Sequence, residues 1–436
     1  MTPAQPGPTG AIETSNLDAR AAAAALLRLV LRQKRPLDDA LDQALTGLED
    51  RDRRFARAIA TTTLRRLGQI DARIDRCLDR PLPKSAAPAR DALRIGAAQL
   101  LFMAVPAHAA VDGSVSLLPA SSKFRGLTNA VLRRIAREGP EAGDDAPISA
   151  ATADWLWRSW TAAYGEAGAA AIVAAQLAEP PVDITVKRDA AGWAERLGGT
   201  LLPTGSIRRR GAGAIEDLPG YADGDWWIQD AAAALPARLL NAGPGQTVID
   251  LCAAPGGKTA QLAAAGATVT AVDRAPKRLA RLQENLARLG LQAETVEADA
   301  AAWRPDRPAD AVLLDAPCSA TGTVRRHPDV TWLKTATDVE KLAGVQSRLL
   351  RAAVDMVRPG GLLVYCVCSL QSEEGPRRIE AFINESAPVE RLPITADEVG
   401  GLTDLITPEG DLRTLPSHLA ELGGMDGFYA CRLRRR

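Results

Sequence analysis

Two cysteines in the C-terminal half of the chain have surroundings in which a thiol can take part in chemistry. Cys318 belongs to the string DAPCSATGT and Cys368 to the string YCVCS, and each string follows an apolar segment that reads as a strand. Two thiols at neighbouring strand ends suit metal ligation, redox exchange or nucleophilic catalysis. Zinc is disfavoured, because it prefers C-x-x-C spacing or several histidines and only His327 is near in sequence, so we expect no metal.

The remaining cysteines have less distinctive surroundings. Six cysteines in 436 residues do not form a disulfide framework, which is typical of a protein in a reducing cytosol. We interpret Cys77, Cys366 and Cys431 as small apolar core residues. Cys366 and Cys368 are two positions apart, so in a strand both thiols face one side unless Cys368 lies just beyond the strand end.

A glycine-rich string, DLCAAPGGKT at 250–259, leaves a predicted strand and enters a predicted helix. Glycines allow close approach of the backbone to a ligand, and the helix N-terminus offers free N–H groups. The string is neither a Walker loop, because Cys252 replaces its first glycine, nor G-x-G-x-x-G. Asp273, Asp299 and Asp315 end the following strands, where Asp273 can accept ribose hydroxyls and Asp299 can meet an adenine amino group. A plain tight turn with surface aspartates is the alternative, but the combination favours a nucleoside-bearing cofactor.

Strands and helices alternate from residue 231 to the end of the chain. Apolar strands are predicted at 247–252, 268–272, 294–298, 311–314 and 362–366, with helices at 277–289 and 338–357. Repeated strand–helix units predict an open, mostly parallel sheet covered by helices, which is a Rossmann-like α/β domain at 231–436. Ligands of such sheets bind at the carboxyl ends of the strands, where the candidate carboxylates and thiols lie.

The rest of the chain predicts a multidomain protein. Residues 1–15 are rich in Pro, Gly and Thr and read as a disordered tail, 16–142 as an all-α domain, and 143–230 as a linker and small α+β domain. Residues 1–142 hold 22 of the 53 basic residues and 15 of the 53 acidic ones, a balance of +7 against −7 in the remainder. This asymmetry indicates that residues 1–142 contact a polyanion, although solvated arginine-rich helices give the same charge balance.

We expect a cytoplasmic protein with no membrane partner, since no apolar stretch is long enough to span a bilayer and no secretion signal is visible.

Three strings together carry a family resemblance: DLCAAPGGKT, DAPCSATGTVRRHPDVTW and YCVCSL. They resemble the RNA 5-methylcytosine methyltransferases of the NOL/NOP2/Sun family. The strings PAHAAVDGSVSL and FRGLTNAVLRRIAREG resemble the NusB-like RNA-binding domain. The combination is similar to bacterial small-subunit (16S) rRNA cytosine-5 methyltransferases, so the resemblance implies S-adenosylmethionine as cofactor and rRNA as the partner.

The resemblance also implies roles for individual residues. Cys368 matches the nucleophile that attacks the base, and Cys318 the thiol that helps to release the product. Asp315 is expected beside the base, where it can stabilise the adduct. Implied cofactor contacts are Cys252, Ala253, Ala254, Pro255, Gly256, Gly257, Lys258, Asp273, Asp299 and Asp315. Two departures from the family pattern are Val367, where threonine is usual, and the additional Cys366.

An RNA substrate requires phosphate contacts and extrusion of the target base. The candidate RNA-binding residues are basic: Arg325, Arg326 and His327 after the Cys318 loop, and Arg125, Arg133, Arg134, Arg53, Arg54 and Arg57 in the helical domain. Arg208, Arg209 and Arg210 form a further basic cluster, whereas Trp226 and Trp227 fit core packing better than base stacking.

The alternative functions are the same chemistry on tRNA or large-subunit rRNA, a non-catalytic RNA-binding factor, and methylation of a protein or small molecule. We expect a monomer.

Overall fold

The computed structural model describes residues 10–139, 147–211, 213–385 and 387–436, which form two compact units. The first unit contains the described residues up to Arg158 together with Arg326–Leu333, and the second contains Ser159–Arg325 and Lys334–Arg436. This division differs from the predicted one in two ways. Residues 147–158 and the short segment 326–333 belong to the N-terminal unit, and the predicted small α+β domain shares one unit with the large sheet.

The first unit is helical, as predicted. Its helices are α1 (Gly10–Leu31), α2 (Leu37–Leu45), α3 (Asp50–Arg65), α4 (Leu67–Arg76), α5 (Ala87–Phe102), α6 (Ala107–Val115), α7 (Arg125–Glu138) and α13 (Val330–Leu333). In α3 the buried residues Ala56, Ile59, Ala60, Thr63 and Leu64 follow helical spacing, which explains why this segment forms a helix against a core.

The helical unit also includes the segment that follows Arg325. Asp329 accepts a hydrogen bond from the backbone N–H of Leu37 at 2.8 Å, and the indole of Trp332 donates to the carbonyl of Leu64 at 2.9 Å. Helix α1 begins at Gly10, so the predicted tail is wrong for residues 10–15, while residues 1–9 of that tail and residues 140–146 of the predicted linker lie outside the described part.

A small antiparallel sheet precedes the large one in the second unit. Its strands β1 (Val182–Val186), β2 (Thr200–Leu201), β3 (Ile207–Arg209) and β4 (Trp226–Ile228) have the order β2-β3-β1-β4, and helix α9 (Ala190–Arg196) packs on them. Trp226 and Trp227 are buried, which confirms the core interpretation. Arg208 is buried too and forms two 2.7 Å hydrogen bonds with buried Asp183, so this part of the predicted basic cluster is structural.

The large sheet has the order β10-β12-β9-β8-β5-β6-β7, with β11 paired to β12. Strands β5, β6, β7, β8 and β9 are mutually parallel, and β12 pairs antiparallel with β9. The strand bounds are β5 (Thr247–Leu251), β6 (Thr268–Asp273), β7 (Glu294–Glu297), β8 (Ala309–Asp315), β9 (Val357–Val367), β10 (Val389–Arg391), β11 (Leu412–Thr414) and β12 (Phe428–Arg435).

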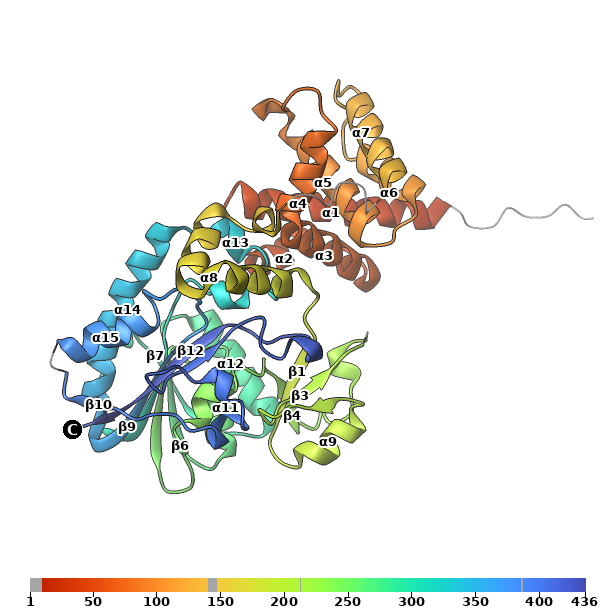
Figure 1. Ribbon diagram of the computed structural model, residues 1–436. Helices are drawn as coiled ribbons and strands as arrows, with labels where there is room; N and C mark the ends of the chain where they lie inside the picture. The colour runs from red at the N-terminus through yellow and green to blue at the C-terminus, as the bar shows by residue number, and fades with distance from the viewer. Residues whose placement is uncertain (1–9, 140–146, 212, 386) are drawn as a thin grey trace, which may run out of the picture. The chain divides into compact units, whose positions relative to one another are not determined.

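Helices cover both faces of this sheet, as Figure 1 shows for α14 and α15 on one side and α11 and α12 on the other. Alternate residues of β8 enter the two cores: Val312 and Leu314 pack with α14 and α15, whereas Ala311 and Leu313 pack with α10 and α11. Besides α9, the helices of this unit are α8 (Asp154–Leu177, which starts in the first unit), α10 (Leu235–Arg238), α11 (Gly257–Ala264), α12 (Pro276–Leu289), α14 (Ala336–Met356) and α15 (Pro376–Asn384). The predicted Rossmann-like α/β fold is therefore confirmed.

The direction of winding of the large sheet reverses beside β5. From β5 the chain winds outward through β6 to β7, and then returns to form β8 and β9 on the other side of β5. Ligands of open α/β sheets bind at such a reversal, at the carboxyl ends of the strands. Those ends carry Cys252, Asp273, Asp315 and Cys368.

Among the described helices, none combines the length and the apolar character that a bilayer crossing requires.

Candidate active site

The loop between β5 and α11 has a backbone that approaches its neighbours closely. Gly256 has φ +100°, and a Cβ atom there would lie 2.7 Å from Cγ of Leu282, so a larger residue does not fit. Cys252 also has positive φ, at +61°. Gly257 starts α11, whose first N–H groups have no carbonyl of their own helix to bind. The loop can therefore present backbone donors to a ligand.

Carboxylates follow the neighbouring strands, as predicted. Asp273 ends β6, is buried, and accepts hydrogen bonds from the N–H groups of Ala254 at 3.2 Å and Ala275 at 3.0 Å. It thereby links the glycine-rich loop to the next strand. Asp299 lies after β7 with its side chain exposed, and one of its oxygens accepts from the N–H of Ala301 at 2.9 Å. Both carboxylates keep acceptor capacity for a ligand.

Lys258 and Asp315 form an ion pair between the loop and β8. The ammonium Nζ donates to Oδ2 of Asp315 at 2.8 Å and lies 4.9 Å from the centroid of the Phe428 ring. Burial is the largest single influence and lowers the pKa of Lys258, but the charge of Asp315, its hydrogen bond to Lys258 and the neighbouring Cys366 and Cys368 together outweigh burial, so the pKa of Lys258 rises overall. Lys258 therefore stays cationic near neutral pH and places one positive charge beside the strand ends.

The two predicted catalytic thiols are in contact. Cys318 lies in the loop after β8, Cys368 is the first residue after β9, and their Sγ atoms are 3.4 Å apart. Of the two alternatives for Cys368, the structure shows the one in which it lies just beyond its strand. The hydrogen bond with Cys368, followed by burial, raises the pKa of Cys318 well above the ordinary value. Cys318 therefore keeps its proton near neutral pH and can donate it to the sulfur of Cys368.

The other cysteines fit the predicted structural roles. Cys366 and Cys431 are fully buried in the two cores of the large sheet, and Cys77 is a half-buried residue against a core of the helical unit. Burial raises the pKa of Cys252 to about 12, so this thiol stays protonated and is a poor nucleophile. Cys366, the departure from the family pattern, directs its thiol at Oδ1 of Asp315, 3.5 Å away.

Behind the thiols lies a polar cluster that the sequence did not reveal. Ser319 and Ser369, which follow the two cysteines, both contact the fully buried carboxylate of Glu374. Helix α8 also reaches this region, because the hydroxyl of Tyr164 donates to the carbonyl of Leu370 at 2.7 Å. The repeated Cys-Ser pair was the only local signal, and it does not identify the glutamate.

The structure corrects the prediction that Arg325 contacts RNA. Its side chain is 1% exposed, with Nε 3.1 Å from Oδ1 of Asp426 and NH1 donating to the carbonyl of Gly423 at 3.0 Å. A buried, paired guanidinium is not accessible to a phosphate. Arg326 is half-buried, and His327 lies 3.3 Å from Asp38 with 45% of its side chain exposed. RNA contact by these two residues stays a prediction.

The candidate RNA-binding arginines of the helical unit differ in their exposure and in the hydrogen bonds that they form within the protein. Arg125 is half-buried and donates to the carbonyls of Leu118 and Val115, so it caps the end of α6. Arg133 and Arg134 are exposed and contact Asn129 and Glu138 on their own helix. Three exposed arginines share one face of α3, namely Arg53, Arg54 and Arg57. Their RNA contacts also stay predictions.

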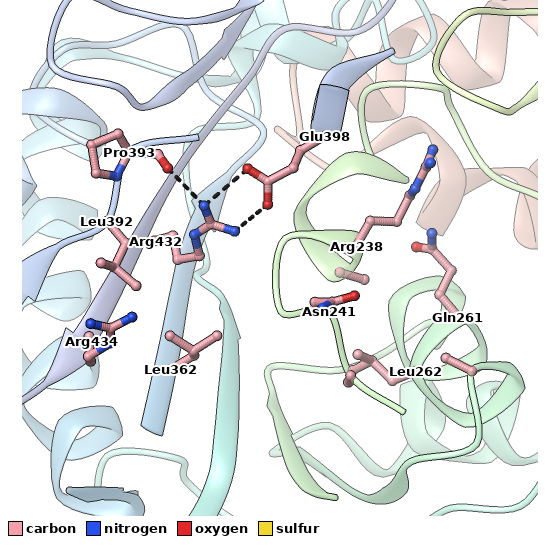
Figure 2. A pocket seen from close by; sticks show the side chains of 13 residues that line it. Arg238, Asn241, Gln261, Leu262, Leu362, Leu392, Pro393, Glu398, Arg432 and Arg434 are labelled. Atoms are coloured by element: carbon pink, nitrogen blue, oxygen red, sulfur yellow. Dashed lines mark hydrogen bonds and ion pairs between the residues drawn. The ribbon is translucent and has the colours of Figure 1, made fainter. Parts of the chain in front are cut away.

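A cavity of about 780 Å³ opens elsewhere in the second unit (Figure 2). Its walls come from α10, α11, β9 and β12, and it contains none of the predicted site residues. Figure 2 shows Arg432 bound to Glu398 and to the carbonyl of Pro393, while Arg238 lies on the opposite wall. Because none of the predicted catalytic or cofactor-binding residues lines this cavity, it is not the candidate active site.

Comparison with known families and proteins agrees with this geometry. Residues 237–434 match the family described as 16S rRNA methyltransferase RsmB/F, and residues 17–137 match the NusB family. The ribosomal RNA small subunit methyltransferase B of Pseudomonas syringae pv. tomato is 37% identical over 441 aligned positions, which cover 96% of this chain and 97% of the relative. The protein of the same name from Xanthomonas campestris pv. campestris is 39% identical, over 86% of this chain and 90% of the relative.

Solved structures share the fold. The crystal structure of PH0851 superposes with a TM-score of 0.75 at 22% identity, over 96% of this chain and 99% of that one. The crystal structure of NSun6 from Pyrococcus horikoshii with SFG gives a TM-score of 0.54 at 20% identity, over 65% of this chain and 98% of that one. At these identities the likeness concerns the fold alone.

The buried carboxyl group of Asp250, within β5, should make the stability of the fold depend on pH. It is fully buried, Thr259 donates to its Oδ2 at 2.6 Å, and burial raises its pKa to about 7. Because the folded state holds this proton more tightly than the unfolded state, stability falls as pH rises from about 4 to 7. Asp250→Asn removes the buried charge, so it should raise the free energy of unfolding at pH 8 by on the order of a few kcal/mol. The gain should shrink as pH falls below 7.

Denaturant titrations at pH 8 and pH 5 measure this difference. Asp310→Asn is the control of opposite sign, because hydrogen bonds from Thr247 and Arg358 lower the pKa of Asp310 to about 2. Asp310 stabilises the fold when ionised, so its substitution should lower stability at pH 8. An Asp250→Asn protein that is less stable than the wild type at pH 8 contradicts the account.

Proposed function

The chain belongs to the 16S rRNA methyltransferase RsmB/F family, and from this premise we propose that it methylates C5 of a cytosine in small-subunit rRNA with S-adenosylmethionine as methyl donor. The observation that carries the proposal is the 3.4 Å contact between the sulfurs of Cys318 and Cys368 at the carboxyl ends of two adjacent parallel strands. The names of relatives that match nearly the whole chain support small-subunit rRNA as the substrate.

The residues around the β5–α11 loop fit S-adenosylmethionine. The N-terminus of α11 offers backbone donors, and Asp273 and Asp299 follow the next two strands. We assign the loop from Cys252 to Lys258, with these two aspartates and Asp315, to the cofactor. When bound, S-adenosylmethionine supplies an electrophilic methyl group on its sulfonium sulfur.

Cys368 acts as the nucleophile in this proposal. C5 of cytosine is a weak nucleophile, and addition of the Cys368 thiolate to C6 moves electron density onto C5. This addition requires a thiolate at Cys368. Cys318 retains its proton near neutral pH, so its S–H group can donate a hydrogen bond to that thiolate. The proposal, following the family resemblance, gives the two thiols different roles although both lie at the same sheet edge.

Asp315 and Cys318 serve the later steps. Asp315, held by Lys258, can accept a hydrogen bond from the exocyclic amine of the base and orient the ring. After the methyl group is in place, the C5 proton leaves and the bond between Cys368 and C6 breaks, which restores the aromatic ring. Cys318, whose sulfur contacts that of Cys368, can relay this proton if its thiol gives its own proton to solvent as it takes up the one from C5.

The helical unit is assigned to binding of the RNA backbone. The exposed arginines of α3, Arg53, Arg54 and Arg57, point from one helix face and can neutralise several phosphates. A non-catalytic RNA-binding role is disfavoured by the paired thiols, which such a factor does not need. The cytoplasmic location and the monomeric state expected from the sequence stay predictions.

Loss of the nucleophile tests the proposal directly. The wild-type protein, incubated with 16S rRNA and isotope-labelled S-adenosylmethionine, should yield 5-methylcytidine, detected by mass spectrometry of the digested RNA. Cys368→Ala should reduce the rate by at least about 10³-fold, because the ring is no longer activated. Binding of S-adenosylmethionine, measured by calorimetry, should be little changed, and Cys431→Ala is the matched control for loss of a buried thiol. Full activity of Cys368→Ala removes the nucleophile assignment.

Loss of the second thiol should instead trap an intermediate. Cys318→Ala should accumulate a covalent protein–RNA complex, because the adduct forms but is released slowly. The complex should appear as a slowly migrating band on a denaturing gel and should be absent from the Cys318→Ala/Cys368→Ala double variant. Methylated product without any such band means that release depends on another group.

A further inference from the structure

A buried carboxylate outside the cofactor loop, Glu374, contacts the residues that follow both thiols. We propose that Glu374 is a positioning residue, which holds the Cys318 loop and the Cys368 loop together so that the two sulfurs stay in contact. The inference rests on the proposed function for its catalytic consequence, but its geometric part concerns the protein alone.

Glu374 is fully buried, and both of its carboxylate oxygens are occupied by donors. Oε1 accepts from the backbone N–H of Ser319 at 2.8 Å and from Nε2 of Gln346 at 3.1 Å. Oε2 accepts from the hydroxyl of Ser369 at 2.5 Å and from the hydroxyl of Ser319. The carboxylate accepts all four of these hydrogen bonds, two at each oxygen.

The partners of Glu374 are the residues directly after the two cysteines. Ser319 follows Cys318 and Ser369 follows Cys368, so each hydrogen bond acts one residue from a reactive sulfur. Consecutive Cα atoms are a fixed distance of about 3.8 Å apart, so a shift of either serine is passed to its cysteine. One side chain thus fixes two loops that follow different strands.

Glu374 is itself held in place from two sides. The hydroxyl of Tyr365, within β9, donates to the main-chain carbonyl of Glu374 at 2.6 Å. Gln346 lies in α14, and the same amide group that donates to Glu374 also donates to the carbonyl of Pro317 at 3.0 Å. The carboxylate is therefore fixed to the sheet and to the helix that covers it, which makes it a firm support for the loops.

The two loops have other connections, so removing the carboxylate should change their alignment more than their fold. The N–H of Gly322 donates to the carbonyl of Cys368 at 3.0 Å, and the N–H of Leu370 donates to the hydroxyl of Thr321 at 3.0 Å. Neither bond involves Ser319, Ser369 or Glu374. Loss of Glu374 should therefore leave the loops folded while the separation and direction of the sulfurs vary.

The rate of oxidative crosslinking between Cys318 and Cys368 reports the relative position of the two thiols in the absence of RNA. With diamide as oxidant, wild-type protein should form the Cys318–Cys368 disulfide rapidly, and peptide mass spectrometry identifies the pair. Glu374→Ala should slow this rate at least about 10-fold and lower kcat about 10- to 100-fold, because displacement of reacting groups by about 1 Å is this costly. The KM for S-adenosylmethionine should stay within about two-fold, since Glu374 makes no contact with the cofactor loop, and thermal melting reports whether the variant is folded.

Two variants separate positioning from a general structural role. Glu374→Gln should recover most of the crosslinking rate and kcat, because its amide oxygen keeps the bonds from Ser319 and Gln346 and its amide N–H groups can donate to the serine hydroxyls. Glu373→Ala, at the neighbouring position with 42% of its side chain exposed, is the matched control and should behave as the wild type.

The outcomes are distinct. A wild-type crosslinking rate in folded Glu374→Ala overturns the proposal, as does a kcat loss equal to the loss of folded protein. Should Glu374→Ala not fold, Ser369→Ala removes the contact of Glu374 on the Cys368 side, together with the bonds of that hydroxyl to Ser319, Thr321 and the N–H of Gln371. Wild-type crosslinking and kcat in that variant overturn the proposal equally. A wild-type protein that crosslinks rapidly but methylates no RNA leaves the geometry standing and contradicts the proposed function instead.

Discussion

Parallel hydrogen bonding between β8 and β9 is the constraint on which the candidate site depends. In this ladder Asp315 lies opposite Cys366, so the chain segments that leave the two strands start side by side. Cys318 and Cys368 consequently have sulfurs 3.4 Å apart although 50 residues separate them along the chain. A shift of the register by one residue would turn every side chain of a strand to the other face, and would separate the thiols from each other and from Asp315.

Several carboxylates lie at the same edge of the sheet, and the fold has to compensate their negative charge. Asp250, Asp273 and Asp315 lie on three adjacent strands, and Lys258 neutralises only the last of them directly. Burial raises the pKa of Asp250 to about 7 and that of Cys252 to about 12, while the contact with Cys368 raises that of Cys318. Perturbed pKa values concentrate at functional sites, because the environments that hold reactive groups also shift their ionisation. The electrostatics therefore agree with the assignment made from thiol geometry and family membership.

Much of this arrangement is readable from the sequence because it depends on local signals. Apolar segments that end in Asp273 or Asp315, followed by glycine or proline, predict strand ends, and these residues indeed end β6 and β8. Contacts between distant segments are not readable in this way. Glu374 meets Ser319 across 55 residues, and Arg325 resembles an exposed basic residue until Asp426 is placed beside it. The assignment of segment 326–333 to the helical unit is equally a matter of tertiary contacts.

The central claim is that the sulfur of Cys368 becomes bonded to the base before the methyl group is transferred. A 16S rRNA transcript containing 5-fluorocytidine tests it most directly, because fluorine at C5 does not leave as a proton does and the adduct persists. The account predicts a complex that depends on S-adenosylmethionine, resists denaturation, and maps by peptide mass spectrometry to Cys368. Absence of a complex, or attachment of the RNA at Cys318 instead, would contradict it.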